Sequence, residues 1–469
     1  AEVDAVRRRL DIPRDALAGS LIVTRLPREL LDVVSEPNPA LDPTLTIRST
    51  SAPIVVGVGN AVPTSLRGDV SISARLIEAG GFDALTLDAA NFYSVDANGG
   101  VVVAGYGRVR VEPEVRLSLG RELIVSTTSV GMTGAGSALL AANYVRLGTT
   151  SRTAQDAPDS EGGGGRLEID ADLVDVVGSV STFGISRTTI SAEGDVRLRG
   201  VYDDASRTYV GSFLTQGDLD LTALQIYPTT LSVFAIEAAG GRAGAEGGAL
   251  TIAASAGQPG KVLSAGGALR LAAPEIAVNG QVRAPSGTLA LSARQLSVGA
   301  DGKLSAALDD SSVLFGTTQG GTTWAYALED GVTRIYGATG LPLPGKRVSL
   351  DADEVALLAG SSVDVGGGGD LLAYEFIPGP TGTRDVLSAA VSPGLFAVVP
   401  SLKLDYFPID PRESESSGNL RVGDRSFRPV PTRCCRRDMP SILTRSSSRA
   451  RRAIRIFRSG SRSNSWTAV

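Results

Sequence analysis

Short runs of alternating apolar and polar residues recur along the chain with a fixed internal spacing. In each run, two apolar residues are separated by a single residue. After a break of four residues, a second pair of apolar residues follows with the same separation. Such alternation is typical of strands that bury one face, and the four-residue break predicts a corner between them. Four segments share the pattern: Leu269, Leu271, Ile276 and Val278; Leu289, Leu291, Leu296 and Val298; Val348, Leu350, Val355 and Leu357; and Leu167, Ile169, Val174 and Val176.

The repeat length indicates how these strands fold. Gly248, Gly267 and Gly287 begin successive segments at intervals of 19 and 20 residues. A unit of this size cannot bury its own apolar face, but copies stacked on one another bury a continuous core. The pattern predicts an all-β chain that folds as a right-handed parallel β-helix, a solenoid of coils of about 20 residues with irregular caps. Antiparallel β-sandwich domains, whose strands also recur at short regular intervals, are the alternative.

The pattern also divides the chain into segments. Residues 1–60 contain short helix-like stretches and a Pro-rich run, which predicts an N-terminal linker or cap. The expected solenoid covers residues 61–375 and is interrupted by two excursions, at residues 149–165 and 309–345. Two C-terminal segments follow it, residues 376–424 and residues 425–469. The first of the C-terminal segments is Pro-rich and is expected to terminate the solenoid by covering its open edge. The second is Arg-rich, lacks alternation, and is expected to be disordered.

The composition of the chain disfavours several classes of function. The chain has no histidine among 469 residues, which removes the commonest general base and the commonest zinc ligand. Residues 425–469 hold 12 of the 45 basic residues and one of the 50 acidic residues, so the rest of the chain has a net charge of −16. An acidic surface disfavours nucleic acid as a partner. The two cysteines are Cys434 and Cys435, and a cysteine-free body suits export through an oxidising compartment.

Two groups of carboxylates could serve an enzyme, because some β-helices cleave polysaccharides with clustered carboxylates. They are Asp351, Asp353 and Glu354 in one repeat and Asp170, Asp172 and Asp175 in another. All six lie between or beside the apolar positions, where the corners of a coil face water. We therefore expect no catalytic residue, no metal site and no cofactor, with a carbohydrate-active β-helix as the alternative.

The tripeptide Arg67-Gly68-Asp69 is a candidate receptor-binding site, because integrins can bind this sequence. The same Gly-Asp pair precedes an apolar alternation at Gly194-Asp195, at Gly217-Asp218 and at Gly369-Asp370. That recurrence favours a turn that leads into a strand. Only Arg67 distinguishes Gly68-Asp69 from the other three Gly-Asp pairs. Both interpretations stay open at this point.

Three aromatic residues in the 309–345 excursion are candidates for carbohydrate contact: Trp324, Tyr326 and Tyr336. Exposed aromatic rings on a loop can stack on sugars, but they can equally pack the loop against the solenoid.

Three stretches carry a family resemblance: "GDVSISARLIEAGGFDALTLDAANF", "GGGGDLLAYEFIPGPTGTRDVLS" and "FAVVPSLKLDYFPIDP". They resemble the C-terminal part of filamentous-haemagglutinin-family exoproteins, the secreted partners of two-partner secretion systems. The resemblance covers about residues 45–424. It implies a non-catalytic adhesin or structural rod, secreted or held at the outer membrane of a bacterium, that binds a host-cell receptor or glycan.

The resemblance also implies a partner and an explanation for the C-terminal tail. The partner is an outer-membrane transporter, which would recognise an N-terminal secretion domain that has no counterpart in this sequence. The first residue is not Met, so we expect an internal fragment of a longer protein. Where the family continues with a sequence similar to "PAGTYTLLPARYALL", a one-base shift gives "RPVPTRCCRRDMP", which is residues 428–440. The tail is therefore predicted to be derived from a frameshift.

Overall fold

The fold was taken from a computed structural model of the chain. It describes residues 19–24, 44–50, 69–89, 92–95, 101–105, 107–150, 161–238, 248–328, 332–337, 340–342, 345–376, 421–422, 425–426, 454–458 and 467–468. This described part is all-β, and its single helix is the six-residue α2 (Ala74–Ala79). None of its helices is long and apolar enough to cross a membrane.

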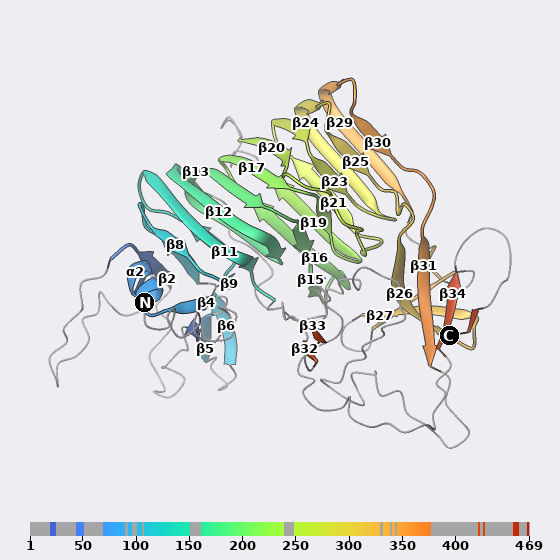
Figure 1. The fold of residues 1–469 in the computed structure, drawn as a ribbon, viewed down its shortest axis with the longest axis horizontal. Coiled ribbons are helices and arrows are strands. Elements are labelled where there is room, and N and C mark those ends of the chain that lie inside the picture. Colours follow the sequence, from blue (N-terminus) through green and yellow to red (C-terminus); the bar gives the residue numbers. More distant parts are fainter. Residues whose placement is uncertain are drawn as a thin grey trace, which may run out of the picture.

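A parallel sheet of 25 strands dominates the structure (Figure 1). Among the paired strands of this sheet, β15 (Val201–Asp203) alone is antiparallel to its neighbour, β16 (Thr208–Leu214). An antiparallel sandwich pairs each strand with a neighbour that runs the opposite way. The sandwich alternative is therefore wrong for this part of the chain.

The pairings arrange the parallel strands in three columns. Column 1 contains β8 (Arg116–Ser118), the first halves of β11 (Gly136–Gly148) and β12 (Glu161–Val177), the second half of β13 (Ser179–Ala192), β17 (Asp218–Ala223), β20 (Ala249–Ala254), β22 (Glu275–Asn279), and the second halves of β24 (Thr288–Val298) and β29 (Arg347–Leu357). Column 2 contains β1 (Gly19–Thr24), β4 (Phe82–Asp88), β9 (Glu122–Ser126), the second halves of β11 and β12, β14 (Val196–Arg199), β18 (Ile226–Pro228), β23 (Gln281–Arg283), β25 (Lys303–Ser305) and β30 (Ser362–Asp364). Column 3 contains β3 (Asp69–Ser73), β2 (Thr44–Arg48), β7 (Arg108–Val111), β10 (Ser129–Gly131), the first half of β13, β16, β19 (Ser232–Glu237), β21 (Ala268–Ala272), and the first halves of β24 and β29.

The register confirms the repeat that the sequence predicts. Leu269 pairs with Leu289, which pairs with Val348. In the same way Ile276 pairs with Leu296, which pairs with Val355. These positions form continuous rows of aliphatic side chains, and rows from all three columns meet in one buried cluster. The hydrophobic core therefore runs along the whole stack.

The chain visits the columns in a fixed order. The first half of β24 lies in column 3 and its second half in column 1, and β25 follows in column 2. The next circuit repeats this order with β29 and β30. These circuits place the chain one strand further along all three columns. An earlier circuit adds no strand to column 2, where β18 pairs directly with β23 although β20 and β21 lie between them in the chain. The corner inside β24 and β29 is the four-residue break of the sequence pattern.

Two glycines show how closely neighbouring coils approach. A Cβ atom added to Gly287 would lie 1.9 Å from the carbonyl oxygen of Gly267, and one added to Gly248 would lie 2.0 Å from that of Gly217. No side chain fits at these distances, so glycine is required where the stacked backbones meet. The contacts also correct the predicted series, because Gly248 begins a strand of column 1 and does not precede Gly267 in one column.

The parallel sheet begins earlier than expected. Strands β1 and β2 belong to it, although they fall within the predicted linker or cap of residues 1–60. The expected helix-like stretches of that segment lie outside the described residues. Helix α2 follows β3 directly, and Ser73 caps it by accepting a hydrogen bond from the Leu76 amide (3.4 Å). A separate hairpin of β5 (Phe92–Val95) and β6 (Val101–Gly105) completes this end.

The first predicted excursion, residues 149–165, is shorter than expected. Gly162 to Gly165 belong to β12, where β12 pairs with β11 and β13. A Cβ atom added to Gly163 would lie 2.3 Å from the Gly184 carbonyl carbon. Glycine at position 163 therefore allows the close approach of β12 to β13.

The second predicted excursion, residues 309–345, leaves the parallel sheet and enters a smaller one. That sheet contains β26 (Ser312–Gln319), β27 (Thr323–Ala327), β28 (Thr333–Tyr336), β31 (Asp370–Phe376), β34 (Ile454–Arg458) and β35 (Thr467–Ala468). Strands β34 and β35 lie in the Arg-rich tail, which was expected to be disordered throughout. Another short pair joins β32 (Arg421–Val422) to β33 (Arg425–Ser426). The rest of the expected terminating region lies outside the described residues, apart from Phe376 in β31.

Candidate functional site

The structure places only part of the tripeptide Arg67-Gly68-Asp69. Asp69 is the first residue of β3 and pairs with Thr44, whereas Arg67 and Gly68 lie outside the described residues. A second Gly-Asp pair has a clear structural role, because Asp218 accepts a hydrogen bond from the Ala249 amide of the next coil (3.1 Å). A strand that begins at the aspartate agrees with the turn interpretation. Receptor binding by the tripeptide stays a prediction.

The three aromatic candidates lie in the smaller sheet. Tyr326 and Tyr336 are each 4 % exposed and pack around Phe315, with ring centroids 5.0 and 5.3 Å away. Trp324 is half-buried, and its Nε1 donates a hydrogen bond to the Phe315 carbonyl (2.5 Å). These contacts lie within the excursion, and the apolar cluster that they form also includes Tyr209 of the hairpin of β15 and β16. The burial of both tyrosines favours packing over carbohydrate contact.

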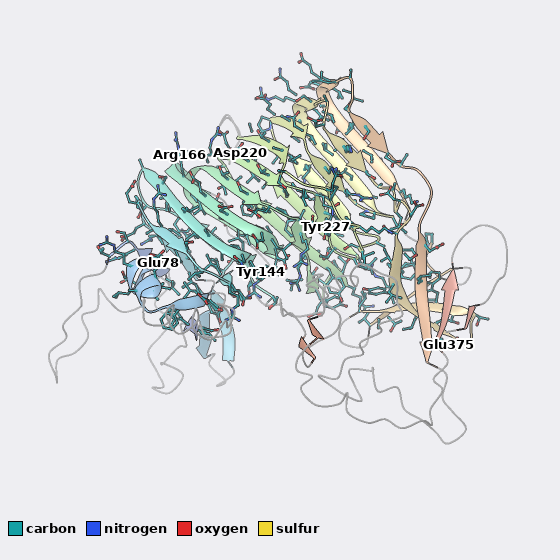
Figure 2. All side chains as sticks on the ribbon, in the orientation of Figure 1. Glu78, Tyr144, Arg166, Asp220, Tyr227 and Glu375 are labelled. Carbon is teal, nitrogen blue, oxygen red and sulfur yellow. The ribbon has the colours of Figure 1, made fainter. Side chains whose placement is uncertain are left out.

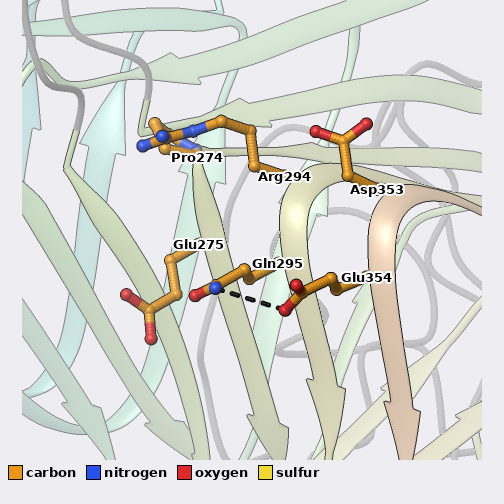
Figure 3. Close-up of a pocket in the computed structure, with 6 residues that line it drawn as sticks. All are labelled: Pro274, Glu275, Arg294, Gln295, Asp353 and Glu354. Carbon is orange, nitrogen blue, oxygen red and sulfur yellow. Dashed lines mark hydrogen bonds between the residues drawn. The ribbon is translucent and has the colours of Figure 1, made fainter.

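A surface hollow lies at the corner of the last three coils (Figure 3). It is lined by Pro274, Glu275, Arg294, Gln295, Asp353 and Glu354. Three of these occupy one ladder row, in which Gln295 pairs with both Glu275 and Glu354. The Gln295 Nε2 donates a hydrogen bond to the Glu354 carboxylate (3.3 Å). The stacking thus brings together carboxylates that are far apart in the sequence.

The chemistry of the hollow suits a polar ligand. All three of its carboxylates are exposed, and Arg294 adds one positive charge beside them. Among the described residues, no three Asp, Glu, Cys or His side chains are placed to hold a metal ion. Asp353 and Glu354 were identified from the sequence, but Glu275 and Gln295 were not. Placing the repeats over one another would have found the row, with an offset of 20 residues from Glu275 to Gln295 and of 59 residues from Gln295 to Glu354.

A cluster of charged residues is buried on column 2, on the face of the strands opposite the aliphatic core. Asp175 on β12 is fully buried and lies in the ladder between Arg146 on β11 and Arg197 on β14. Arg197 donates to the Asp175 carboxylate from Nε (2.5 Å) and from Nη2 (2.8 Å). Two further donors reach the same carboxylate, the Tyr144 hydroxyl (2.8 Å) and the Arg199 guanidinium (3.3 Å). This fork geometry is the strong form of an arginine–carboxylate pair.

Burial and the charge of Asp175 have opposite effects on the pKa values of the arginines in this cluster. Burial lowers the pKa of Arg146, and the nearby charge of Arg199 adds to that effect. Burial also disfavours the charged form of Arg197, but the adjacent Asp175 outweighs burial and raises its pKa. The residues of the cluster are buried, and they lie between Tyr144, which donates to Asp175, and Tyr227, which pairs with Arg197 in the next coil. Figure 2 labels both tyrosines. The cluster therefore links three consecutive coils and offers no surface to a ligand.

The position of Asp175 corrects a prediction. Asp170 and Asp172 face water at the corner of β12 as expected, but Asp175 is enclosed by arginines of the neighbouring coils. The alternation predicts correctly that Asp175 points away from the core. It carries no information about what covers the other face of the strand. The signal that was missed is the alternation of opposite charges along one row, Arg146, Asp175 and Arg197.

A half-buried carboxylate lies nearby on the same column. Asp195 precedes β14 and accepts hydrogen bonds from the Gln225 amide (3.3 Å) and the Tyr227 hydroxyl (3.1 Å). Burial raises the pKa of Asp195, while these hydrogen bonds and the charges of Arg197 and Arg283 oppose the shift. The Gln225 amide also donates to the Gly260 carbonyl (3.1 Å), which ties the segment before β21 to this face.

Comparisons of the chain with protein-family models, with curated proteins and with solved structures give no match.

Replacing Asp175 tests the energetic role of the buried cluster. Asp175→Asn leaves the guanidinium groups of Arg197 and Arg199 buried without their carboxylate. We expect the free energy of unfolding to fall by about 3–5 kcal/mol, measured by urea denaturation followed by circular dichroism. The matched control is Asp172→Asn, three residues away on the same strand but exposed, which should change it by less than about 0.5 kcal/mol. Equal, small effects of both substitutions would show that the cluster contributes little.

The raised pKa of Asp195 predicts a dependence of stability on pH. In the unfolded chain Asp195 titrates near its ordinary value of 3.8, whereas the folded protein holds the proton to a higher pH. Between these two pKa values the folded state binds more protons, so the free energy of unfolding falls as pH rises through this window. Asp195→Asn should remove this contribution, since the amide is neutral at every pH. Urea denaturation across the window measures it, and parallel pH profiles for wild type and variant would contradict it.

Proposed function

We propose that the chain is a non-catalytic rod module of a secreted or surface-bound adhesin, similar to the filamentous-haemagglutinin family, and that it folds as a right-handed parallel β-helix. The observation that carries the proposal is the fixed order in which the chain visits the three parallel columns, at the offset of one coil. Nearly all connections between parallel strands of one sheet are right-handed, which supports that hand for the solenoid.

The proposed architecture suits an adhesin, because a long rod holds its binding segments at a distance from the bacterial surface. Each coil adds one strand spacing, about 4.8 Å, to the length of the rod. Segments that leave the stack, such as β26 to β28, are then displayed along its side (Figure 1). The cysteine-free body suits passage through an oxidising compartment before folding. The proposed partners are an outer-membrane transporter during export and a receptor or glycan on the host cell afterwards.

A carbohydrate-binding function is the second candidate, and the hollow at the corner of the last three coils is the observation that favours it. The row Glu275, Gln295 and Glu354 presents hydrogen-bonding groups in line along the rod axis. An extended sugar chain could lie along such a row and accept or donate a hydrogen bond at each coil.

Attachment is tested with fluorescent beads coated with the purified full chain and incubated with cultured epithelial cells. We expect more bound beads than with an unrelated acidic protein of similar size. Attachment at the level of that control would overturn the adhesin proposal. Asp69→Glu keeps the charge at the start of β3 but lengthens the side chain, which integrins do not accept. If attachment is unchanged in Asp69→Glu, the tripeptide is not the binding site.

Carbohydrate binding is tested on a glycan array with the same chain. The double variant Asp353→Asn/Glu354→Gln should weaken any polysaccharide signal at least tenfold, because it removes two of the three carboxylates in the hollow. Asp170→Asn/Asp172→Asn is the matched control, since those carboxylates are also exposed at a corner of column 1, on β12. An equal loss in both variants, or no signal for the wild type, argues against the hollow as a binding site.

A further inference from the structure

Column 2 has one strand fewer than its neighbours in the middle of the stack. Column 1 contains β20 between β17 and β22, and column 3 contains β21 between β19 and the first half of β24. In column 2, by contrast, β18 pairs directly with β23, through the single pair of Ile226 and Val282. Since each strand adds about 4.8 Å, the stack is shorter by one strand spacing along column 2 than along the other two columns.

The segment that connects β20 to β21 has the sequence pattern of a column 2 strand. Residues 260–267, "GKVLSAGG", match residues 280–287, "GQVRAPSG", at the offset of 20 residues that also relates β21 to β24. The match gives Val262 the position of Val282, which faces the core from β23. The later strand β25 lies in a similar sequence, "GKLSA" at residues 302–306. The repeat therefore predicts a strand between β18 and β23.

The structure places this segment outside the stack, on the outer face of column 2. It belongs to no strand of the described part of the chain. Val262 is 1 % exposed and packs against Tyr227, which points outward from β18 because its neighbour Ile226 points into the core. Leu263 is also buried, in the apolar cluster that includes Tyr209. Both aliphatic side chains are therefore buried outside the column whose pattern the segment carries.

Hydrogen bonds hold the segment at its two ends. The Gln225 side-chain amide donates to the Gly260 carbonyl (3.1 Å), and the Leu231 amide donates to the Ala265 carbonyl (3.1 Å). Among the described atoms, the Ser264 hydroxyl and the Gln225 side-chain carbonyl oxygen are buried without a hydrogen-bond partner, which costs free energy. The outer position therefore satisfies the polar groups of this region only in part.

We propose that residues 260–264 can enter column 2 as a strand between β18 and β23, and that the stack therefore has two arrangements. In the second arrangement Val262 lies between Ile226 and Val282 in one row and faces the core. Entry of the strand makes the three columns equal in length here, which changes the curvature of the stack, so the segment acts as a hinge. The inference rests on the pairings and the repeat, and is independent of the proposed attachment function.

Cysteine cross-linking of the full chain distinguishes the two arrangements. In a background in which both native cysteines are replaced by serine, I226C/V282C reports the described pairing and I226C/V262C reports the inserted strand. We expect each variant to form its disulfide under mild oxidation, because paired strands bring such residues within disulfide reach. The matched control I226C/K261C should form none, since Lys261 would face away from the core. A disulfide in I226C/V282C alone would overturn the proposal and show that the segment stays outside.

Hydrogen exchange provides a second measurement that needs no new cysteine. Leu263→Arg introduces the residue that β23 carries at the matching position, Arg283, and removes an apolar side chain from the cluster around Tyr209. The variant should favour insertion, so we expect the amides of residues 261–264 to exchange at least tenfold more slowly than in the wild-type chain. K261R changes an exposed side chain and should leave their exchange unaltered. Faster exchange in L263R, as for a substitution that only loosens the segment, would contradict the proposal.

Discussion

Each coil of this protein buries its aliphatic side chains against the coil before it and the coil after it, and has no other way to bury them. Leu291, for example, lies between Leu271 and Leu350 in one row, and all of its neighbours along the row come from other coils. Burial of such a side chain contributes about 1.5–3 kcal/mol, but only when both neighbouring coils are in place. The stability of one coil is therefore a property of its interfaces with its neighbours.

The same dependence accounts for the glycines and for the segments that leave the stack. Backbones of adjacent coils must approach to the spacing of hydrogen-bonded strands, so a Cβ atom is excluded at positions such as Gly287. Insertions are accommodated only at corners, where the chain already leaves one column for the next. The segment from β26 to β28 departs after β25 and returns at β29 without disturbing the pairing of β24 with β29. It carries its own apolar cluster around Phe315, and this cluster holds it against the stack.

The sequence predicted which side chains share a row across the coils, but not which column each strand belongs to. The spacing of Leu269, Leu271, Ile276 and Val278 predicted the pairs with the next coil correctly, because a period of two specifies which side chains face the core. Gly248 was placed in the wrong column, because glycine precedes strands of column 1 as well as strands of column 3 and so does not identify the column. The hollow was predicted only in part, through Asp353 and Glu354, and the buried cluster was not predicted, because Asp175 was expected to face water. Both depend on which residues become neighbours at offsets of 20 residues or more, and local alternation does not report this.

The charged row of Arg146, Asp175 and Arg197 determines which coils are neighbours, which the aliphatic rows do not. Valine, leucine and isoleucine can exchange places along a row at small cost, so coils held together only by such rows are nearly interchangeable. Opposite charges on consecutive coils are specific, because a coil inserted between β11 and β12, or between β12 and β14, would separate Asp175 from an arginine. Duplication or loss of a coil is thus compatible with the fold toward the C-terminal end. Around Asp175 the order of the coils is fixed, and the stack of strands can change in length only elsewhere.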